Sequence, residues 1–380
     1  MNTASDSLEL SGVDGANPLG FLAALGTLVT TRAAGETDAR LFWKRGRTWV
    51  PGLDALAVSD PAKLSEKLAE ALRGREVAAE AEERRNAAQR SLEEASTAIK
   101  KKRDEIKERG LTREERRTAT ETEVAPLERQ RDRRRTEWLA VLRVAVPRPE
   151  LALGRTIDCT AEEYREHATG LLEQAGCATR EPLDFLAAFG SDTCVKRDKK
   201  EPDEIEHTPF CFTTGGGKQY FLECARKLIA AVSADRVREA LFEPWTYGDP
   251  GLSMRWDPVE DKRYALTDLK PADEGASTVW MANLLAYRGL TLFPCAPTRG
   301  GLGTTAWSTP DDHVFTWPIW EFAASPDMIR SLLQLQELTG QSLHRAMHER
   351  GVAEVFCARR IKFGAGSNYK LNFSKSTRVG

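Results

Sequence analysis

The apolar positions of the chain follow the same short pattern twice. Asn17-Pro-Leu-Gly-Phe-Leu-Ala-Ala-Leu-Gly-Thr27 and Glu181-Pro-Leu-Asp-Phe-Leu-Ala-Ala-Phe-Gly-Ser191 share seven identical positions. A proline near the start, apolar residues at helical spacing and a closing glycine predict a buried helix with Pro in its first turn and Gly as its C-cap. The chain is therefore expected to contain two related modules.

Each copy is followed by alternating apolar residues that predict a β-hairpin and then a second helix. After the first copy, strands at residues 39–43 and 48–50 flank a basic turn over residues 44–47. After the second copy, strands at residues 208–213 and 219–222 flank a glycine-rich turn. We interpret this order as a tandem duplication of one helix, β-hairpin, helix module, with too few copies for a solenoid.

Between the copies the pattern changes to that of one long helix. Residues 73–135 contain no aromatic side chain and consist mostly of Ala, Glu, Lys, Arg, Gln and Thr. Leu92, Ile99 and Ile106 recur every seven residues, as the seam of a coiled coil requires. We expect this segment to pair with a second arm.

The chain is expected to fold back near Gly110. Thr112-Arg-Glu-Glu115 is a capping box that restarts a helix, and Pro126 should kink the second arm. The result would be a long antiparallel coiled-coil hairpin. A solvated spacer or protein-docking arm is the favoured role; the alternative is contact between its basic tip and a phosphate backbone or partner subunit. The tip contains Lys100 to Arg103, Lys107, Arg109, Arg113, Arg116 and Arg117.

The last third of the chain predicts strands with short helices. These elements are a bent strand pair over residues 253–266, a helix over residues 280–288 ended by Gly289, a strand over residues 315–321, a helix from Ser325 to Leu335, and a hairpin over residues 355–363 and 369–373. The chain as a whole predicts an α+β fold. Its expected parts are a first α+β module at residues 1–72, the antiparallel coiled-coil hairpin at 73–145, a second α+β module at 146–250, and a mixed, β-rich C-terminal region at 251–380.

Composition limits the classes of function. The 380 residues are 41% hydrophobic, which supports two or three domains with their own cores, and the net charge of −2 gives no global attraction to nucleic acid. Nucleic-acid binding would need local basic patches. The seven cysteines never take C-x-x-C spacing, which favours buried thiols over zinc or disulfides. Because the sequence shows no signal peptide and no apolar stretch of bilayer length, we expect a cytoplasmic protein that does not associate with a membrane.

Catalytic patterns are weak. Asp257, Glu260 and Lys262 have the residue types of a metal-dependent nuclease but lie too close together, so surface ion pairing is the favoured interpretation. Thr214 to Lys218 lacks the spacing and hydroxyl of a phosphate-binding P-loop. No catalytic residue, cofactor or metal is predicted, which favours a binding protein.

Basic residues beside glycine-rich turns are the candidate binding residues. Such turns expose backbone N–H groups that can approach phosphates, and the segment Thr298-Arg-Gly-Gly-Leu-Gly-Thr-Thr305 is a further example. A solvated loop is the alternative at each position. The candidate nucleic-acid-binding residues are Lys44, Arg45, Arg47, Lys196, Arg197, Lys199, Lys200, Lys218, Arg299, Arg359, Arg360 and Lys362.

Four segments resemble CRISPR-associated proteins of the type I-G systems, formerly called I-U, in their large-subunit and accessory members. The segments run from Leu8 to Gly26, from Trp256 to Leu266, from Ala286 to Pro294 and from Phe315 to Trp320. The resemblance touches most of the chain outside the coiled-coil hairpin, which is expected to be an insertion. Its motifs are structural in kind.

The resemblance implies a non-enzymatic subunit of an RNA-guided antiviral complex, or an accessory to one. In such complexes base pairing reads the target while protein subunits contact backbone and shape. The implied partners are CRISPR RNA, target DNA or both, and other CRISPR-associated subunits including a helicase-nuclease. A structural adaptor whose coiled-coil arm docks another protein and a metal-dependent nuclease are the alternatives.

Overall fold

The chain forms two compact units, and the first of them mixes helices and strands. One unit comprises Met1–Gly74 with Arg155–Gly380, and the other is Arg75–Gly154. The mixture of helix and sheet confirms the predicted α+β character. The computed structural model describes residues 7–174, 180–196, 203–214, 219–260, 277–308, 313–339, 344–365 and 368–379.

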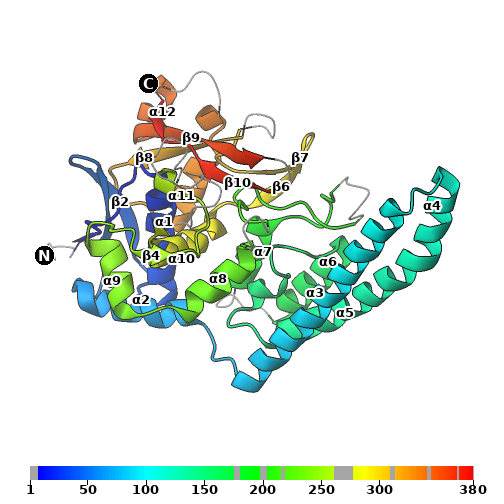
Figure 1. The fold of residues 1–380 in the computed structure, drawn as a ribbon. Helices are drawn as coiled ribbons and strands as arrows, with labels where there is room; N and C mark the ends of the chain where they lie inside the picture. Colours follow the sequence, from blue (N-terminus) through cyan, green and yellow to red (C-terminus); the bar gives the residue numbers. More distant parts are fainter. Residues whose placement is uncertain are drawn as a thin grey trace, which may run out of the picture. The chain divides into compact units, whose positions relative to one another are not determined.

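Two buried helices form the centre of the first unit. α1 (Pro18–Ala33) and α10 (Trp280–Gly289) lie side by side (Figure 1). The side chain of Asn17 accepts a hydrogen bond from the N–H of Leu19, and Pro18 occupies the first turn of α1 as expected. The first copy of the repeated apolar pattern therefore marks core, since α1 is buried on nearly every side.

Two glycines permit the close crossing of α1 and α10. The expectation that Gly26 caps α1 is wrong, because the helix continues through it for another seven residues, to Ala33. A Cβ at Gly26 would lie 1.6 Å from the carbonyl oxygen of Leu285, and one at Gly289 would lie 2.6 Å from that of Leu22. Gly289 is the last residue of α10, so both glycines are required by packing between backbones rather than by a turn.

The described residues of the first unit form two larger sheets and two short strand pairs. The predicted first hairpin is present as β2–β3, and β1 adds to its other edge. The C-terminal hairpin is also present, as β9–β10, with β8 and β11 pairing further along β9 (Figure 1). The strands are β1 (Leu8–Glu9), β2 (Arg40–Arg45), β3 (Trp49–Asp54), β4 (Asp249–Pro250), β5 (Ser277–Thr278), β6 (Cys295–Thr298), β7 (Gly301–Thr304), β8 (Val314–Trp320), β9 (Val352–Ala365), β10 (Asn368–Phe373) and β11 (Thr377–Arg378).

An aromatic cluster joins α1 to these sheets. The ring of Phe21 lies 5.8 Å from that of Trp43 and 5.9 Å from that of Trp317. The indole of Trp317 also donates to the carbonyl oxygen of Gly15 at 2.9 Å, and that of Trp320 donates to the carbonyl oxygen of Leu41 at 2.9 Å. The first repeat helix is thus packed against the apolar strand β8 of the C-terminal region.

The second repeat helix also contacts α10. α7 (Glu181–Phe189) stacks Phe185 on Tyr287 at 5.0 Å, and its first residue, Glu181, forms an ion pair with the buried Arg288. The hairpin expected after it is not formed in the described residues, because residues 208–213 are not a strand. An isolated bridge between Thr214 and Tyr220 is the pairing observed there.

The remaining elements of the first unit differ from expectation at one place. The predicted strand pair at residues 253–266 is not present over its described part, where irregular backbone leads into the 3-10 helix η5. Ser325 caps a helix as predicted by accepting from Met328 N–H. The other helices are α2 (Pro61–Arg73), α6 (Ala161–Gln174), α8 (Phe221–Ala230), α9 (Ala234–Phe242), η5 (Pro258–Glu260), η6 (Leu290–Leu292), α11 (Pro326–Leu333), η7 (Gln336–Thr339) and α12 (His344–Glu349).

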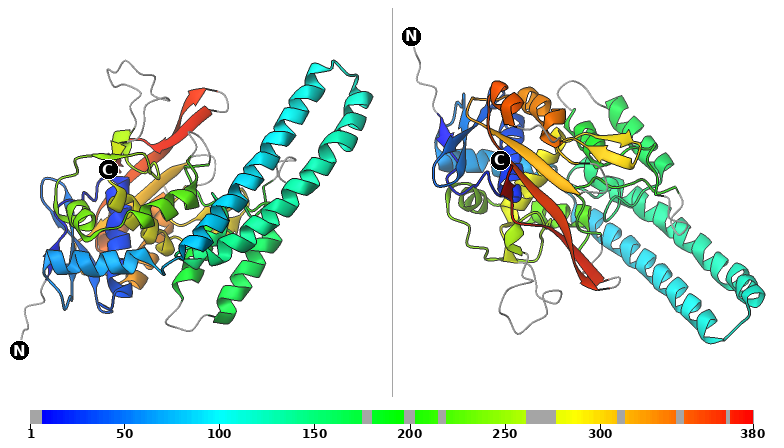
Figure 2. Two further views of the ribbon diagram at one scale, coloured as in Figure 1. Left: turned by 60° about the horizontal axis from the view of Figure 1, so that its bottom comes forward. Right: turned by 90° about the horizontal axis from the view of Figure 1, so that it is seen from above.

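The second unit contains two long helices that run side by side in opposite directions (Figure 2). A small apolar core of Ile99, Ile106, Ala119 and Val124 joins the first long helix to the segment that leads into the second. Its elements are α3 (Ala79–Glu108), α4 (Arg113–Ala119), the π-helical turn η1 (Thr120–Val124), α5 (Ala125–Val144) and η2 (Pro149–Ala152).

The capping box and the proline of the second unit have distinct structural roles. Thr112 accepts from the N–H of Glu115 while the Glu115 carboxylate accepts from the N–H of Thr112, as the sequence predicts. Pro126 follows η1, in which the N–H of Ala125 donates to the carbonyl of Thr120, five residues earlier. A π-helical turn is one of the ways in which a helix accommodates proline.

Candidate nucleic-acid interface

The candidate basic residues fall in four places of the first unit. Arg197, Lys199, Lys200 and Lys218 lie outside the described residues. The others lie in the β2–β3 turn (Lys44, Arg45, Arg47), beside residue 204 (Lys196), in the β6–β7 turn (Arg299) and on β9 (Arg359, Arg360, Lys362).

Two of the four places are largely occupied by local contacts. Lys44 pairs with Glu9 at 2.5 Å, and the guanidinium of Arg45 lies 5.9 Å from the ring centre of Trp49. Arg47 is exposed beside them. Lys196 pairs with Glu204 at 3.0 Å. A phosphate at Lys44 or Lys196 would have to compete with a carboxylate already present.

The β6–β7 turn has an exposed cation but a partly occupied backbone. Arg299 is exposed at its tip. Gly301 has φ +116, and a Cβ there would lie 2.7 Å from a carboxylate oxygen of Glu206. Glu206 accepts from the N–H of Leu302 at 2.6 Å. One amide of the glycine-rich turn therefore binds an anion of the same chain, which leaves the Arg299 side chain as the available basic group.

Alternation along β9 separates its three basic residues. Arg360 and Lys362 share a face of the strand with Ala358, whose neighbour across the ladder is Phe315 of the aromatic cluster. Arg359 points to the other face and is exposed, and Lys362 is exposed with its ammonium 3.8 Å from the ring centre of Tyr369. Arg360 is thus the basic side chain that turns toward the core.

Arg360 is held by uncharged acceptors. Its guanidinium donates to the carbonyl oxygen of Pro209 at 3.4 Å and contacts Nδ1 of His313 at 2.7 Å. Since a guanidinium only donates hydrogen bonds, the ring nitrogen is the acceptor in this contact. Burial lowers the pKa of Arg360. Among the residues that the structure describes, no Asp or Glu carboxylate pairs with it.

A cavity of about 130 Å³ is lined by Arg360 and by Pro209 and His313, the two residues that its guanidinium contacts. Its described lining contains hydrogen-bonding side chains and no acid. Trp307 is 8% exposed, and its indole N–H is buried without a hydrogen-bond partner. The polar lining consists of His207, Thr304, Trp307, Ser308, His313 and Arg360, and the other lining residues are Pro209, Leu302 and Gly303.

His313 is fixed by an unusual backbone conformation. Its φ of +50 lies in the left-handed region, which residues other than glycine rarely adopt. In that conformation its carbonyl accepts the N–H of Arg360 at 2.8 Å. The same residue therefore contacts both the backbone and the side chain of Arg360, which positions the guanidinium beside the cavity.

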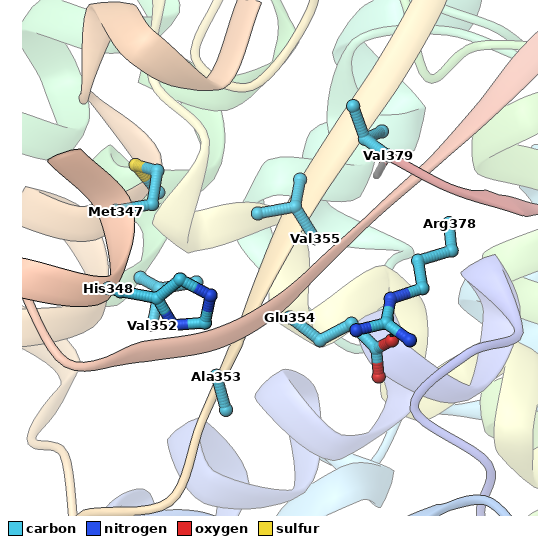
Figure 3. Close-up of a pocket in the computed structure, with 8 residues that line it drawn as sticks. All are labelled: Met347, His348, Val352, Ala353, Glu354, Val355, Arg378 and Val379. Atoms are coloured by element: carbon cyan, nitrogen blue, oxygen red, sulfur yellow. Dashed lines mark ion pairs between the residues drawn. The ribbon is translucent and has the colours of Figure 1, made fainter. Parts of the chain in front are cut away.

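A second cavity, next to β9 and β11, is too small to be a comparable site. It measures about 30 Å³, room for about one water. The Arg378 guanidinium lies against the Glu354 carboxylate there (Figure 3), and Glu354 also accepts from the indole N–H of Trp49. These contacts fasten the C-terminal strand to the first hairpin.

The acidic candidate Asp257 is part of the core, so its assignment to surface ion pairing is wrong. Its side chain is fully buried, and its carboxylate accepts from Asn17 Nδ2 at 3.1 Å, from Tyr247 Oη at 3.1 Å and from the N–H of Val259 at 3.0 Å. Burial raises the pKa of Asp257. Within the described ranges, no group of three or more His, Cys, Asp or Glu side chains could hold a metal ion.

Sequence reasoning identified Arg299 and Arg360 but missed His207, Trp307 and His313. No local signal marks these three residues: His207 lies about a hundred residues before Trp307 and His313, and all three line the cavity together with residues of β7 and β9. Among the helices that the structure describes, none has the length and apolar character needed to cross a membrane. No protein-family model and no curated protein sequence matches the chain.

Proposed function

We propose that this chain is a non-enzymatic nucleic-acid-binding subunit whose phosphate contacts centre on Arg360. The observation that carries the proposal is a partly buried guanidinium that faces a cavity without any acid in its described lining. Removing an unpaired cation from water is costly unless an anion compensates for it. A phosphate group supplies that anion and accepts the donors that line the cavity.

The neighbouring cations extend this site along the strand. Lys362 lies two residues beyond Arg360, about 7 Å along β9, and on the same face. Arg359 is exposed on the opposite face, and Arg299 is exposed at the β6–β7 turn. Binding through several such cations weakens as salt rises, because each phosphate contact releases counterions.

The resemblance to type I-G CRISPR proteins gives this binding its proposed context. The chain would act within an RNA-guided antiviral complex, or as its accessory, contacting CRISPR RNA or target DNA and partner subunits that include a helicase-nuclease. In support, the described parts of the four segments pack together: α1 against α10, Asn17 against Asp257, and β8 beneath α1. β8 also pairs with β9 through Val314 and Arg359, so these segments form the scaffold of the binding strand.

The finer architecture is proposed on the same basis. We infer that the parts around α1 and α7 are related modules, since each begins with Pro in its first turn and each packs on α10. We interpret α3 and α5 as an antiparallel coiled-coil hairpin inserted between them, with Ile99 and Ile106 on the seam.

Titration of RNA and DNA against the full chain tests the proposed function. Fluorescence anisotropy at several salt concentrations should show affinity that falls with salt. Arg360→Gln combined with Lys362→Gln should weaken binding and reduce the salt slope by about 0.7 to 0.9 for each phosphate that is no longer neutralised. Lys63→Gln is the matched control, because Lys63 is exposed on α2 and outside the site. Equal weakening by the control and the double variant would contradict the proposal.

A second function, docking of a partner protein, is favoured by the second unit. That unit has its own apolar core and a groove of about 310 Å³ along α3. Charge reversal of Lys100, Arg103 and Lys107, which line the groove, should then reduce co-purification of a partner without changing nucleic-acid affinity. Loss of nucleic-acid affinity instead would assign the groove to the phosphate backbone.

A further inference from the structure

We propose that the cavity beside Arg360 receives the terminal phosphate of a nucleic-acid strand, a phosphate monoester, rather than an internal phosphodiester. This inference rests on the proposed function and names the ligand group of the same site. It follows from where the donors lie, how many there are and how much room they leave.

The donors lie below the surface. The Trp307 indole N–H is buried and has no partner, and Arg360 reaches inward from β9 to the carbonyl of Pro209. A phosphate that contacts both groups must enter the cavity. The cavity of about 130 Å³ has room for a group of a few non-hydrogen atoms. A continuous strand, with a sugar on each side of every phosphate, would have to pass both sugars through the same opening.

The number of donors also matches a monoester. A terminal phosphate has three free oxygens and a charge between about −1.5 and −2 at pH 7, whereas an internal phosphodiester has two free oxygens and one charge. The Arg360 guanidinium presents a fork of N–H groups, and Trp307, whose indole N–H has no partner, lines the same cavity.

The exposed cations lie close in the chain to residues that line the cavity. Arg299 is on the turn that precedes the lining residue Leu302, and Lys362 follows Arg360 on the same face of β9. These groups would contact later phosphates regardless of how the strand ends. The exposed cations therefore bind any strand, and the cavity adds a preference for strands with a phosphorylated end.

The test compares one oligonucleotide with different ends. A single sequence is prepared with a 5′-phosphate, a 3′-phosphate or hydroxyls at both ends, and each is titrated against the full chain. One phosphorylated form should bind at least tenfold more tightly than the hydroxyl form. Inorganic phosphate should displace this phosphorylated form more strongly than it displaces the hydroxyl form. The two phosphorylated arms identify which end is bound.

Two variants separate the cavity from the exposed cations. Arg360→Gln and Trp307→Phe should each abolish the preference for a phosphorylated end, so that the phosphorylated and hydroxyl forms bind each variant with equal affinity. Trp307→Phe removes the indole N–H but keeps an aromatic ring among Phe210, Phe315 and Phe373. Circular dichroism checks that both variants are folded.

The possible failures are distinguishable. If all three end forms bind equally and Arg360→Gln weakens them equally, the terminal-phosphate inference is wrong and the proposed function stands. If the preference persists in both variants, the end is bound elsewhere and the inference is again wrong. If no form binds, both the inference and the proposed function fail.

Discussion

Replacing Gly26 by alanine tests whether the crossing of α1 and α10 sets the stability of the first unit. The added Cβ would lie 1.6 Å from the carbonyl oxygen of Leu285 and 2.8 Å from the nitrogen of Gly289. Carbon–oxygen contacts in proteins are comfortable at about 3.3 Å, so the helices would have to separate by about 1.7 Å. Both contacting groups are backbone, which a change of rotamer cannot relieve.

The expected magnitude follows from two opposing effects. Alanine in a helix is favoured over glycine by about 1 kcal/mol. Overpacking a core costs about 1 to 3 kcal/mol and sometimes more, and a clash between two buried backbones belongs at the upper end. Gly26→Ala should therefore lower the free energy of unfolding by about 2 kcal/mol or more.

Gly170 provides the matched control within the same unit. It lies inside α6, and a Cβ there would meet no heavy atom within 4 Å. Gly170→Ala should raise the free energy of unfolding by about 0.5 to 1 kcal/mol through helix propensity alone. Urea unfolding followed by tryptophan fluorescence measures both variants. Wild-type stability in Gly26→Ala would refute the argument that backbone contact requires glycine at this crossing.

Three further predictions concern other parts of the molecule. The hydrogen bond from Lys67 holds the pKa of the buried Glu36 below its ordinary value. Ionised Glu36 therefore stabilises the fold above about pH 4.5, and this contribution disappears as pH falls through the lowered pKa. Glu36→Gln should lower the free energy of unfolding by about 1 to 3 kcal/mol at pH 7, and its difference from wild type should shrink in acid. Ile106→Ala should destabilise the second unit by about 2 to 5 kcal/mol, and hydrogen exchange should then accelerate in α3 and α5 while α1 stays protected. Desolvation raises the pKa of the half-buried Cys295 thiol to about 12, so iodoacetamide at pH 8 should leave it unmodified in the folded chain, and rapid modification would contradict the raised pKa.

Strong helical periodicity and capping residues are the reliable guides to the fold. The helix at residues 18–33, the capping box at Thr112 and the cap at Ser325 all follow from local chemistry that acts over a few residues. The role of Gly26 does not, because a C-cap glycine and a helix-crossing glycine look alike in sequence. Only the approach of α10, more than two hundred residues later, distinguishes them.

Apolar alternation is a weaker guide than helical periodicity. Residues 208–213 alternate as a strand would, but Phe210 instead packs on Trp256 and Phe315, and Phe212 on Phe373. Alternating apolar and polar residues indicate only that every second side chain is buried. Packing among aromatic rings can bury these side chains without any pairing to another strand. Tertiary contacts therefore decide between strand and loop at this segment.

The candidate site is predictable by residue type but not by geometry. Arg359 and Arg360 are adjacent in sequence and equally basic, yet strand alternation exposes one and turns the other toward a cavity. That difference depends on which face of β9 meets the aromatic cluster. The contributions of Trp307 and His313 depend on the same packing, because neither residue lies in a recognisable motif.

The first position of each repeat copy differs, because its side chain contacts a different buried group in each copy. Asn17 caps α1 with its carbonyl oxygen and uses its amide to donate to the buried Asp257 carboxylate. Glu181, at the equivalent position of α7, instead gives a carboxylate to the buried Arg288 guanidinium. An acid at position 17 would face another buried acid, and an amide at position 181 would remove a charge opposite a buried cation. The apolar positions can therefore stay the same in both copies, because each packs on α10, while the polar position must match the charge of its own partner.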